Sequence, residues 1–118
     1  MNSYIVYGIK NCDTVKKALQ WLNQKKISFE FHDYKSKGIS AGKLKEWCKQ
    51  TGWESLVNKK GTTWRQLEEE VKNKITGEPA AIALMIGKTS LIKRPLIEKE
   101  GKIAALGFDE KAYSKNLS

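Results

Sequence analysis

The most constraining feature of this sequence is a change of hydrophobic period near its N-terminus. Residues 4–7 (Tyr-Ile-Val-Tyr) are aromatic and β-branched and end at Gly8, which predicts a buried strand. From Thr14 the apolar residues recur at helical spacing, and residues 28–34 alternate between apolar and polar again. Strand, helix and strand in this order predict a βαβ unit with parallel strands and a right-handed crossover. The helical stripe consists of Val15, Ala18, Leu19 and Leu22.

The middle of the chain predicts helices. Ser40 is a suitable cap for a helix that runs through Thr51 and closes at Gly52. Thr63 followed by Gln66 forms a capping box, which predicts one further helix. The residues that this helix turns inward would be Trp64, Leu67, Val71 and Ile75.

A third helix and a C-terminal hairpin complete the prediction. Pro79 suits a first helical turn, and residues 80–86 have no polar face, so we expect this short helix to be deeply buried before Gly87 ends it. Strand structure then returns with Leu91-Ile92. Two strands flank Glu100-Gly101 as a hairpin, and a last helix runs through Leu117. The hairpin strands are residues 96–97 and 103–106, and the cap of the last helix is Asp109.

The predicted fold class is therefore α/β, with the order βαβ, helical insert, ββα around a small mixed sheet. A chain of 118 residues with 40% hydrophobic residues is long enough for one domain with its own core. We expect a single domain over residues 1–118, with a core of about 1–38 and 88–118 and an insert of about 39–87.

Composition excludes several classes of protein. Two cysteines and one histidine cannot build a zinc cluster or a disulfide framework. No apolar run approaches the ~20 residues that a membrane helix needs, and the N-terminus does not have the pattern of a signal peptide. We therefore expect a cytoplasmic protein with no membrane partner.

The net charge of +9 raises the question of nucleic-acid binding. The basic residues are spread thinly, and only Arg65 and Arg94 are arginines, the side chain that favours base readout and bidentate phosphate contacts. The composition favours a solvated basic surface over specific nucleic-acid binding.

Cys12 is the residue best placed for chemistry, because it stands where the first strand ends and the first helix begins. Free backbone N–H groups and the helix dipole favour thiolate at such a position. Lowering a thiol pKa from about 8.5 to about 6 requires about 3.4 kcal/mol, whereas a helix terminus supplies at most ~2 kcal/mol. A cation must therefore contribute, and Lys10 or the distant Arg94 could supply it.

Other polar and aromatic residues are weaker candidates. Arg94-Pro95 would lie at a bend or sheet edge, where the arginine could hold an oxyanion or carboxylate; a solvated surface turn is the alternative. Cys48 lies on the inward stripe of its helix, so we expect it to be a packed core residue. The alternative is that it is the resolving thiol, which would form a disulfide with Cys12. His32 is expected to be structural, and the basic turn at residues 59–61 to be a solvated loop. The tryptophans expected mostly in the core are Trp21, Trp47, Trp53 and Trp64.

Four segments together resemble the ArsC/Spx family, and most closely its YffB-like branch. They are residues 7–18 (Tyr-Gly-Ile-Lys-Asn-Cys-Asp-Thr-Val-Lys-Lys-Ala), 31–34 (Phe-His-Asp-Tyr), 58–65 (Asn-Lys-Lys-Gly-Thr-Thr-Trp-Arg) and 93–96 (Lys-Arg-Pro-Leu). The resemblance covers nearly the whole chain. It implies a thioredoxin/glutaredoxin-like fold with a helical insertion, a nucleophilic Cys12, and an Arg94-cis-Pro95 beside that thiol. It also implies glutathione or a similar low-molecular-weight thiol as co-reductant.

The chain also departs from the family patterns. Arsenate reductases of this family carry three arginines around the oxyanion; Arg94 matches one, and Asn58 and Gly107 stand where the others are expected. One guanidinium in place of three predicts poor arsenate binding. Spx regulators usually carry a C-x-x-C switch, whereas Val15 stands at its second position. Gly52 lies where such regulators touch RNA polymerase, but a helix stop accounts for it as well.

These observations predict a monothiol oxidoreductase in which Cys12 is the nucleophile and Arg94 stabilises the thiolate. Lys10 would add positive field, and the substrate or thiol would bind at Lys10, Asn11, Asp13, Thr14 and Pro95. We expect no bound metal or organic cofactor, a small thiol as co-substrate, and a small thiol or oxyanion substrate. The alternatives are a regulator that binds RNA polymerase and a true arsenate reductase coupled to glutaredoxin.

Overall fold

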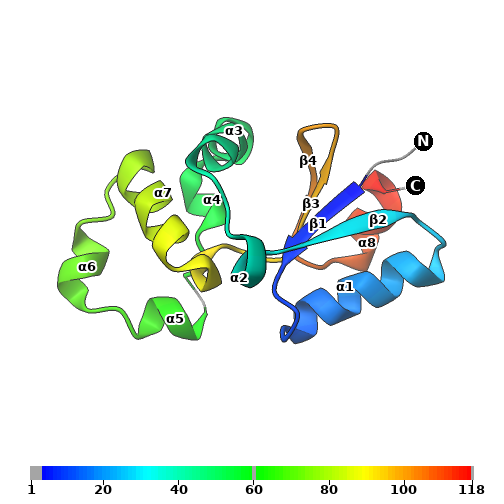
Figure 1. Ribbon diagram of the computed structural model, residues 1–118, viewed down its shortest axis with the longest axis horizontal. Coiled ribbons are helices and arrows are strands. Elements are labelled where there is room, and N and C mark those ends of the chain that lie inside the picture. Colours follow the sequence, from blue (N-terminus) through cyan, green and yellow to red (C-terminus); the bar gives the residue numbers. More distant parts are fainter. Residues whose placement is uncertain (1–3, 60, 118) are drawn as a thin grey trace. The chain divides into compact units, whose positions relative to one another are not determined.

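The computed structural model describes residues 4–59 and 61–117. By its internal contacts the chain forms two compact units, one of Met1–Lys37 with Arg94–Ser118 and one of Gly38–Lys93. Each unit has its own helices (Figure 1). Over the described ranges, no helix is long and apolar enough to cross a membrane.

The first unit is built on a four-stranded mixed sheet in the order β2-β1-β3-β4. β1 pairs in parallel with β2, Tyr4 lying opposite Phe29, and antiparallel with β3, which pairs antiparallel with β4. The predicted βαβ unit and hairpin are thus confirmed. The elements of this unit are β1 (Tyr4–Gly8), α1 (Asp13–Gln24), β2 (Phe29–Asp33), α2 (Tyr34–Lys37), β3 (Leu96–Lys99), β4 (Lys102–Leu106) and α8 (Glu110–Asn116).

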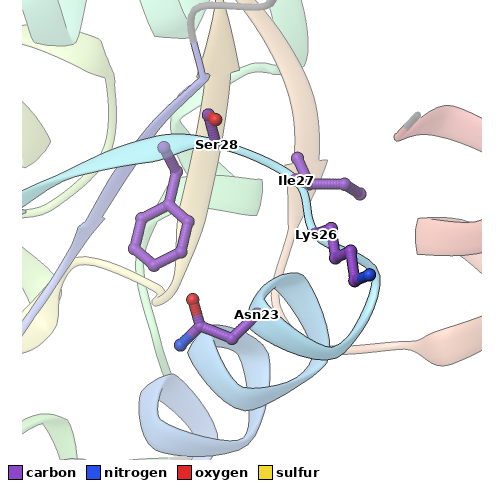
Figure 2. Close-up of a pocket in the computed structure, with 5 residues that line it drawn as sticks. Asn23, Lys26, Ile27 and Ser28 are labelled. Atoms are coloured by element: carbon purple, nitrogen blue, oxygen red, sulfur yellow. The ribbon is translucent and has the colours of Figure 1, made fainter.

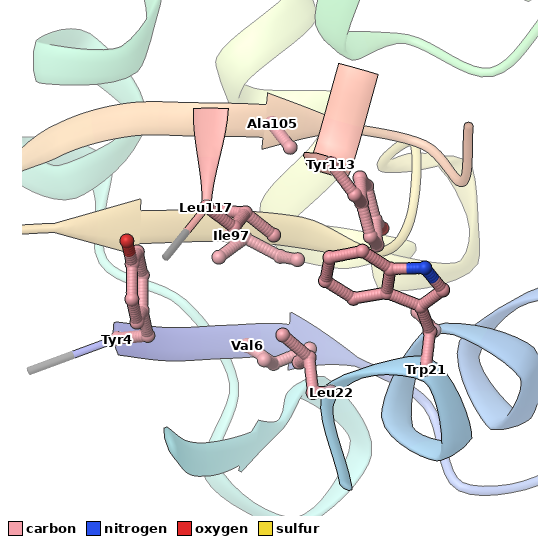
Figure 3. Packing of buried hydrophobic residues seen from close by; sticks show 9 residues of the cluster. Tyr4, Val6, Trp21, Leu22, Ile97, Ala105, Tyr113 and Leu117 are labelled. Carbon is pink, nitrogen blue, oxygen red and sulfur yellow. The ribbon is translucent and has the colours of Figure 1, made fainter. Parts of the chain in front are cut away.

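Both α1 and α8 contribute to one core on the same face of this sheet (Figure 3). Because side chains alternate along a strand, Val6 and Ile97, which are fully buried, point to this face. The ring of Trp21 from α1 packs edge-on against that of Tyr113 from α8, with centroids 5.3 Å apart. The described members of the core are Tyr4, Val6, Ala18, Trp21, Leu22, Ile97, Ala105, Tyr113 and Leu117.

Caps end the helices largely where the sequence predicts. Asp109 accepts hydrogen bonds from the amides of Lys111 and Ala112 at the start of α8. The second strand ends one residue before the predicted boundary, because Tyr34 begins α2. The side chain of Asp33 accepts a hydrogen bond from the amide of Lys35 and so turns the chain out of the strand.

The second unit is helical. Ser40 caps the first of its helices by accepting from the amide of Lys43 at 3.1 Å, and Gly52 ends it with φ +85°, as predicted. An isolated antiparallel bridge joins Val57 to Ile92. The elements are α3 (Ala41–Thr51), α4 (Trp53–Leu56), α5 (Thr62–Arg65), α6 (Glu69–Asn73), α7 (Glu78–Gly87) and a 3₁₀ turn η1 (Thr89–Leu91).

The prediction of a single helix after Thr63 is wrong. Two short helices, α5 and α6, stand in its place, and Thr63 lies inside α5 behind an N-cap at Gly61. The four residues expected to point inward are only half-buried, so a continuous helix would gain little from packing. They are Trp64, Leu67, Val71 and Ile75.

Two other expectations for this unit also need correction. α7 begins with Pro79 in its first turn as predicted, but it is not buried throughout, because Ile86 is 42% exposed. Leu91 belongs to η1 rather than to a strand.

Candidate active site

Cys12 occupies the N-cap position of α1, immediately after the loop that leaves β1. Its backbone is extended (φ −117°, ψ 121°) and its side chain is partly exposed. The end of β1 approaches α1 closely: a Cβ on Gly8 would lie 2.9 Å from Cγ2 of Val15. A glycine at this position therefore allows the first turn of α1 to pack beside the strand. The sulfur of Cys12 lies at the N-terminal end of this helix.

The surroundings of Cys12 favour its thiolate. Burial by itself raises the pKa of the thiol, but four other influences together outweigh burial and leave the pKa below its ordinary value. In decreasing order they are the backbone N–H of Val15, the hydrogen bond from Arg94, the charge of Arg94, and the backbone N–H of Thr14. Both amides belong to the first turn of α1, where free N–H groups and the helix dipole favour a negative charge.

Arg94 reaches this sulfur from the segment that leads into β3. The Arg94–Pro95 peptide bond is cis, and the carbonyl oxygen of Pro95 accepts a hydrogen bond of 2.8 Å from the amide of Gly107. The guanidinium is half-buried and hydrogen-bonds the Cys12 sulfur. Two residues far apart in the sequence thus form one charge-assisted contact.

The other residues predicted for the site lie on the same loop and helix start, with different consequences. Lys10 is exposed, and the charged side chain that lowers the pKa of Cys12 is that of Arg94. Water screens such an exposed ammonium. Asn11, Asp13 and Thr14 are exposed around the sulfur's loop, while Pro95 is buried.

Two features were missed by sequence reasoning. The first is the amide of Val15, which was considered only for its apolar side chain. The second is a polar group on the opposite face of the sheet from the core, where the hydroxyl of Tyr7 donates to Oε1 of buried Glu98 at 3.1 Å. The ring of Tyr7 lies 4.8 Å from that of His32 and 6.1 Å from that of Tyr34. The alternation of β1 and β3 could have indicated the Tyr7–Glu98 contact, but only once their register was known.

The candidate residues of the second unit have structural surroundings. Cys48 is a buried free cysteine in α3, and burial, with a smaller effect from Glu78, raises the pKa of its thiol. Trp53 and Trp64 are half-buried rather than in the core, and the ammonium of Lys59 lies over both rings, 5.5 and 5.7 Å from their centroids. Lys60, the middle residue of the predicted basic turn, lies outside the described residues.

A cavity of about 410 Å³ opens where α1 turns into β2, at the end of the helix opposite Cys12, and Asn23, Lys26 and Ser28 line it (Figure 2). Within residues 4–59 and 61–117, no three His, Cys, Asp or Glu side chains are grouped so that they could hold a metal ion.

Comparison with known proteins identifies the family. Residues 7–116 match the model of the ArsC family. The chain belongs to the ArsC family. It is 49% identical over 108 residues to an uncharacterized protein of Haemophilus influenzae, covering 92% of this chain and 93% of that protein. It is 24% identical over 108 residues to the global transcriptional regulator Spx of Lactiplantibacillus plantarum, covering 90% of this chain and 80% of that one.

Solved structures of ArsC-related proteins share the fold. A YffB protein superposes with a TM-score of 0.90 at 44% identity, covering 98% of this chain and 99% of the other. An arsenate reductase-related protein of Brucella melitensis superposes with a TM-score of 0.77 at 42% identity, covering 96% and 92%. These matches confirm the predicted thioredoxin-like fold for this ArsC family member.

Proposed function

We propose that this ArsC family member is a monothiol oxidoreductase that uses Cys12 as its nucleophile and a low-molecular-weight thiol such as glutathione as co-substrate. The observation that carries the proposal is the contact between the Arg94 guanidinium and the Cys12 sulfur at the start of α1. A thiolate is the nucleophile in thiol–disulfide exchange, and its fraction at neutral pH rises as the pKa falls.

In the proposed cycle the Cys12 thiolate attacks the small-thiol sulfur of a mixed disulfide X–S–S–R. A new disulfide forms between Cys12 and the R sulfur, the S–S bond of X–S–S–R breaks, and X–S⁻ leaves as a thiolate that takes a proton from water. A second small thiol, as thiolate, then attacks the R sulfur of that disulfide, which releases RSSR and restores the Cys12 thiolate. The net reaction is X–S–S–R + RSH → X–SH + RSSR: the sulfur of X is reduced, that of the second small thiol is oxidised, and the Cys12 thiolate is regenerated.

Residues around the sulfur have separate roles in this proposal. Arg94 stabilises the thiolate and orients an anionic group of the substrate, because a guanidinium can hold a carboxylate bidentately. Asn11, Asp13 and Thr14 form the exposed rim on which the small thiol rests, and Pro95 forms its inner wall. Lys10 is kept as a residue that attracts anions at the rim. The cycle needs a reducing compartment, and we propose the cytoplasm.

Mass spectrometry after treatment with an oxidised small thiol tests this cycle. We expect one adduct, on Cys12, which the reduced thiol removes; Cys12→Ser should abolish it and Cys48→Ser should leave it intact. A disulfide between Cys12 and Cys48 in the wild type would replace the monothiol cycle by a dithiol one. Failure of Cys12 to form any adduct would refute the proposal.

Reduction of arsenate is a narrower function within the same family. Gly107 stands at one position where the resemblance implies an arginine, and its φ of +84° lies in the region that favours glycine. We expect arsenate-dependent NADPH oxidation, coupled through glutaredoxin and glutathione, to be weak. Vigorous, Cys12-dependent oxidation would make arsenate the substrate.

The similarity to Spx motivates a second candidate, a regulator that binds RNA polymerase. Gly52→Arg is a poor test, because its φ of +85° and ψ of 151° would strain any larger residue whatever its partner. Glu54→Lys, on the exposed side of α4, changes the neighbouring surface without that strain. Retention of the polymerase α subunit by the wild type and its loss in Glu54→Lys would favour the regulator; no retention at all would exclude it.

A further inference from the structure

The proposed cycle does not use Glu98. Among the residues that the structure describes, Glu98 is the one charged side chain that is buried. Its side chain is 2% exposed, and one of its oxygens accepts the hydrogen bond from Tyr7. Burying a carboxylate is costly unless hydrogen bonds and an opposite charge compensate it. A single tyrosine hydroxyl supplies only part of that compensation.

The register of the sheet places Glu98 near the segment that carries Arg94. Tyr7 lies opposite Leu96 on β3, so Glu98 is its diagonal neighbour on the same face, within reach of a long aromatic side chain. Arg94 stands two positions before Leu96, on the same chain segment. Tyr7 is thus the side chain between the buried carboxylate and the entrance of β3.

Tyr34 lies within electrostatic reach of both Arg94 and Glu98. Its hydroxyl is buried, has no hydrogen-bond partner among the described residues, and belongs to a ring 6.1 Å from that of Tyr7. Burial and the nearby Tyr7 raise the pKa of Tyr34, the charge of Arg94 lowers it, and the charge of Glu98 raises it. The groups facing this hydroxyl and Glu98 are therefore Tyr7, Arg94 and, beside Tyr7, His32.

We propose that Glu98, held by the hydroxyl of Tyr7, is a positioning residue that sets the Arg94 guanidinium against the Cys12 sulfur. In this arrangement the carboxylate acts on the guanidinium through its charge, and the sulfur accepts a hydrogen bond from it. This inference rests on the proposed function only in assigning the Cys12 thiolate a role; the placement of Arg94 is testable by itself.

The sign of one measurement separates positioning from a simple field effect. Removing a negative charge near a thiolate lowers the thiol pKa by Coulomb's law. Removing the group that positions the stabilising guanidinium raises it. Glu98→Gln keeps the shape of the side chain and deletes its charge, so its effect on the pH profile of Cys12 alkylation decides between the two.

We expect Glu98→Gln to move the alkylation midpoint of Cys12 upward, toward that of Arg94→Ala. A rise of about 0.5 in the midpoint corresponds to about threefold slower alkylation below it. Added to Arg94→Ala, the same substitution should cause no further rise. Glu30→Gln, which deletes an exposed carboxylate from β2, is the matched control and should leave the midpoint unchanged.

A second readout does not depend on the thiol. The sequence holds two arginines, and Arg65 is exposed, so the Nε–Hε spectrum should show one signal from an ordered Arg94 and one solvent-like reference. In Glu98→Gln the Arg94 signal should move toward that of Arg65. An unchanged Arg94 signal, or an unchanged or lowered alkylation midpoint, would overturn the positioning role.

Two further outcomes are distinguishable. If the wild-type midpoint is that of an ordinary thiol, the proposed function fails, while the Arg94 signal still decides the role of Glu98. If Glu98→Gln does not fold, Tyr7→Phe removes only the hydroxyl that holds the carboxylate. It should shift both readouts in the same direction by a smaller amount, and no shift would count against the proposal.

Discussion

The guanidinium of Arg94 hydrogen-bonds the sulfur of Cys12, although one residue caps the first helix and the other precedes the third strand. β3 pairs directly with β1 in antiparallel orientation, so the segment that follows β1 and the segment that precedes β3 lie at the same end of the sheet. The antiparallel register therefore brings the cation to the helix start. A helix terminus alone supplies less stabilisation than a strongly acidic thiol requires. The contact with Arg94 adds to the stabilisation that the helix terminus provides.

Replacement of Arg94 should raise the pKa of Cys12. In Arg94→Ala both the hydrogen bond and the charge are lost, while the amides of Val15 and Thr14 remain, so the effect should be partial. Iodoacetamide alkylation of Cys12, followed by mass spectrometry across pH, measures the midpoint. We expect the wild-type midpoint to lie below the ordinary thiol value of about 8.5.

Arg65→Ala is the matched control for that experiment, because it deletes the other arginine from an exposed position in the second unit. Its midpoint should equal that of the wild type. A wild-type midpoint at about 8.5 or above, or equal midpoints in Arg94→Ala and the wild type, would contradict the role given to Arg94.

The lowered pKa of Cys12 also predicts a pH-dependent stability. A group whose pKa is lower in the folded state stabilises that state fully above its unfolded pKa, about 8.5, and loses this contribution as the pH falls through the folded pKa. Relative to Cys12→Ser, the wild type should therefore gain free energy of unfolding as the pH rises. Urea denaturation under reducing conditions at acidic and alkaline pH measures the difference, in which the effect of Cys48 cancels. A difference that does not change with pH would contradict the prediction.

Gly8→Ala should disturb both the core and the thiol. The new Cβ would meet Cγ2 of Val15 at 2.9 Å, and a β-branched side chain has little freedom to move aside. We expect a loss of roughly 1–3 kcal/mol in the free energy of unfolding and a higher Cys12 pKa, because the first turn of α1 must shift. In the double variant with Val15→Ala the two losses should be less than additive; strict additivity would show that no clash had occurred.

Two glycines, one in the first turn of α3 and one at its C-cap, should have opposite effects on stability when replaced by alanine. Gly52 ends the helix with φ +85° and ψ 151°, a conformation restricted to glycine, so Gly52→Ala should cost roughly 1–3 kcal/mol. Gly42 lies within the helix with open space around its Cα, so Gly42→Ala should stabilise by roughly 0.5–1 kcal/mol. Thermal or urea denaturation measures both. Equal effects would mean that backbone conformation does not explain the glycine at position 52.

Local signals predicted the elements whose stability is decided within a few residues. Ser40 and Asp109 cap helices in the structure as their side-chain chemistry predicts, and Glu100-Gly101 turns the hairpin with both residues at positive φ. The helix expected after Thr63 failed because its apolar residues are only half-buried, and a capping box cannot extend a helix that gains so little from packing.

By itself the sequence determined the order of strands and helices, the N-cap position of Cys12, and the resemblance to the ArsC/Spx family. It also indicated that the thiol needed a cation in addition to the helix terminus. Only the tertiary structure decided that Arg94 is the cation that contacts the sulfur. It also decided that the Tyr7 hydroxyl donates a hydrogen bond to Glu98 on the sheet face opposite the core. The physical reason is that periodicity and capping depend on near neighbours, whereas these contacts depend on the register between β1 and β3, which no local pattern encodes.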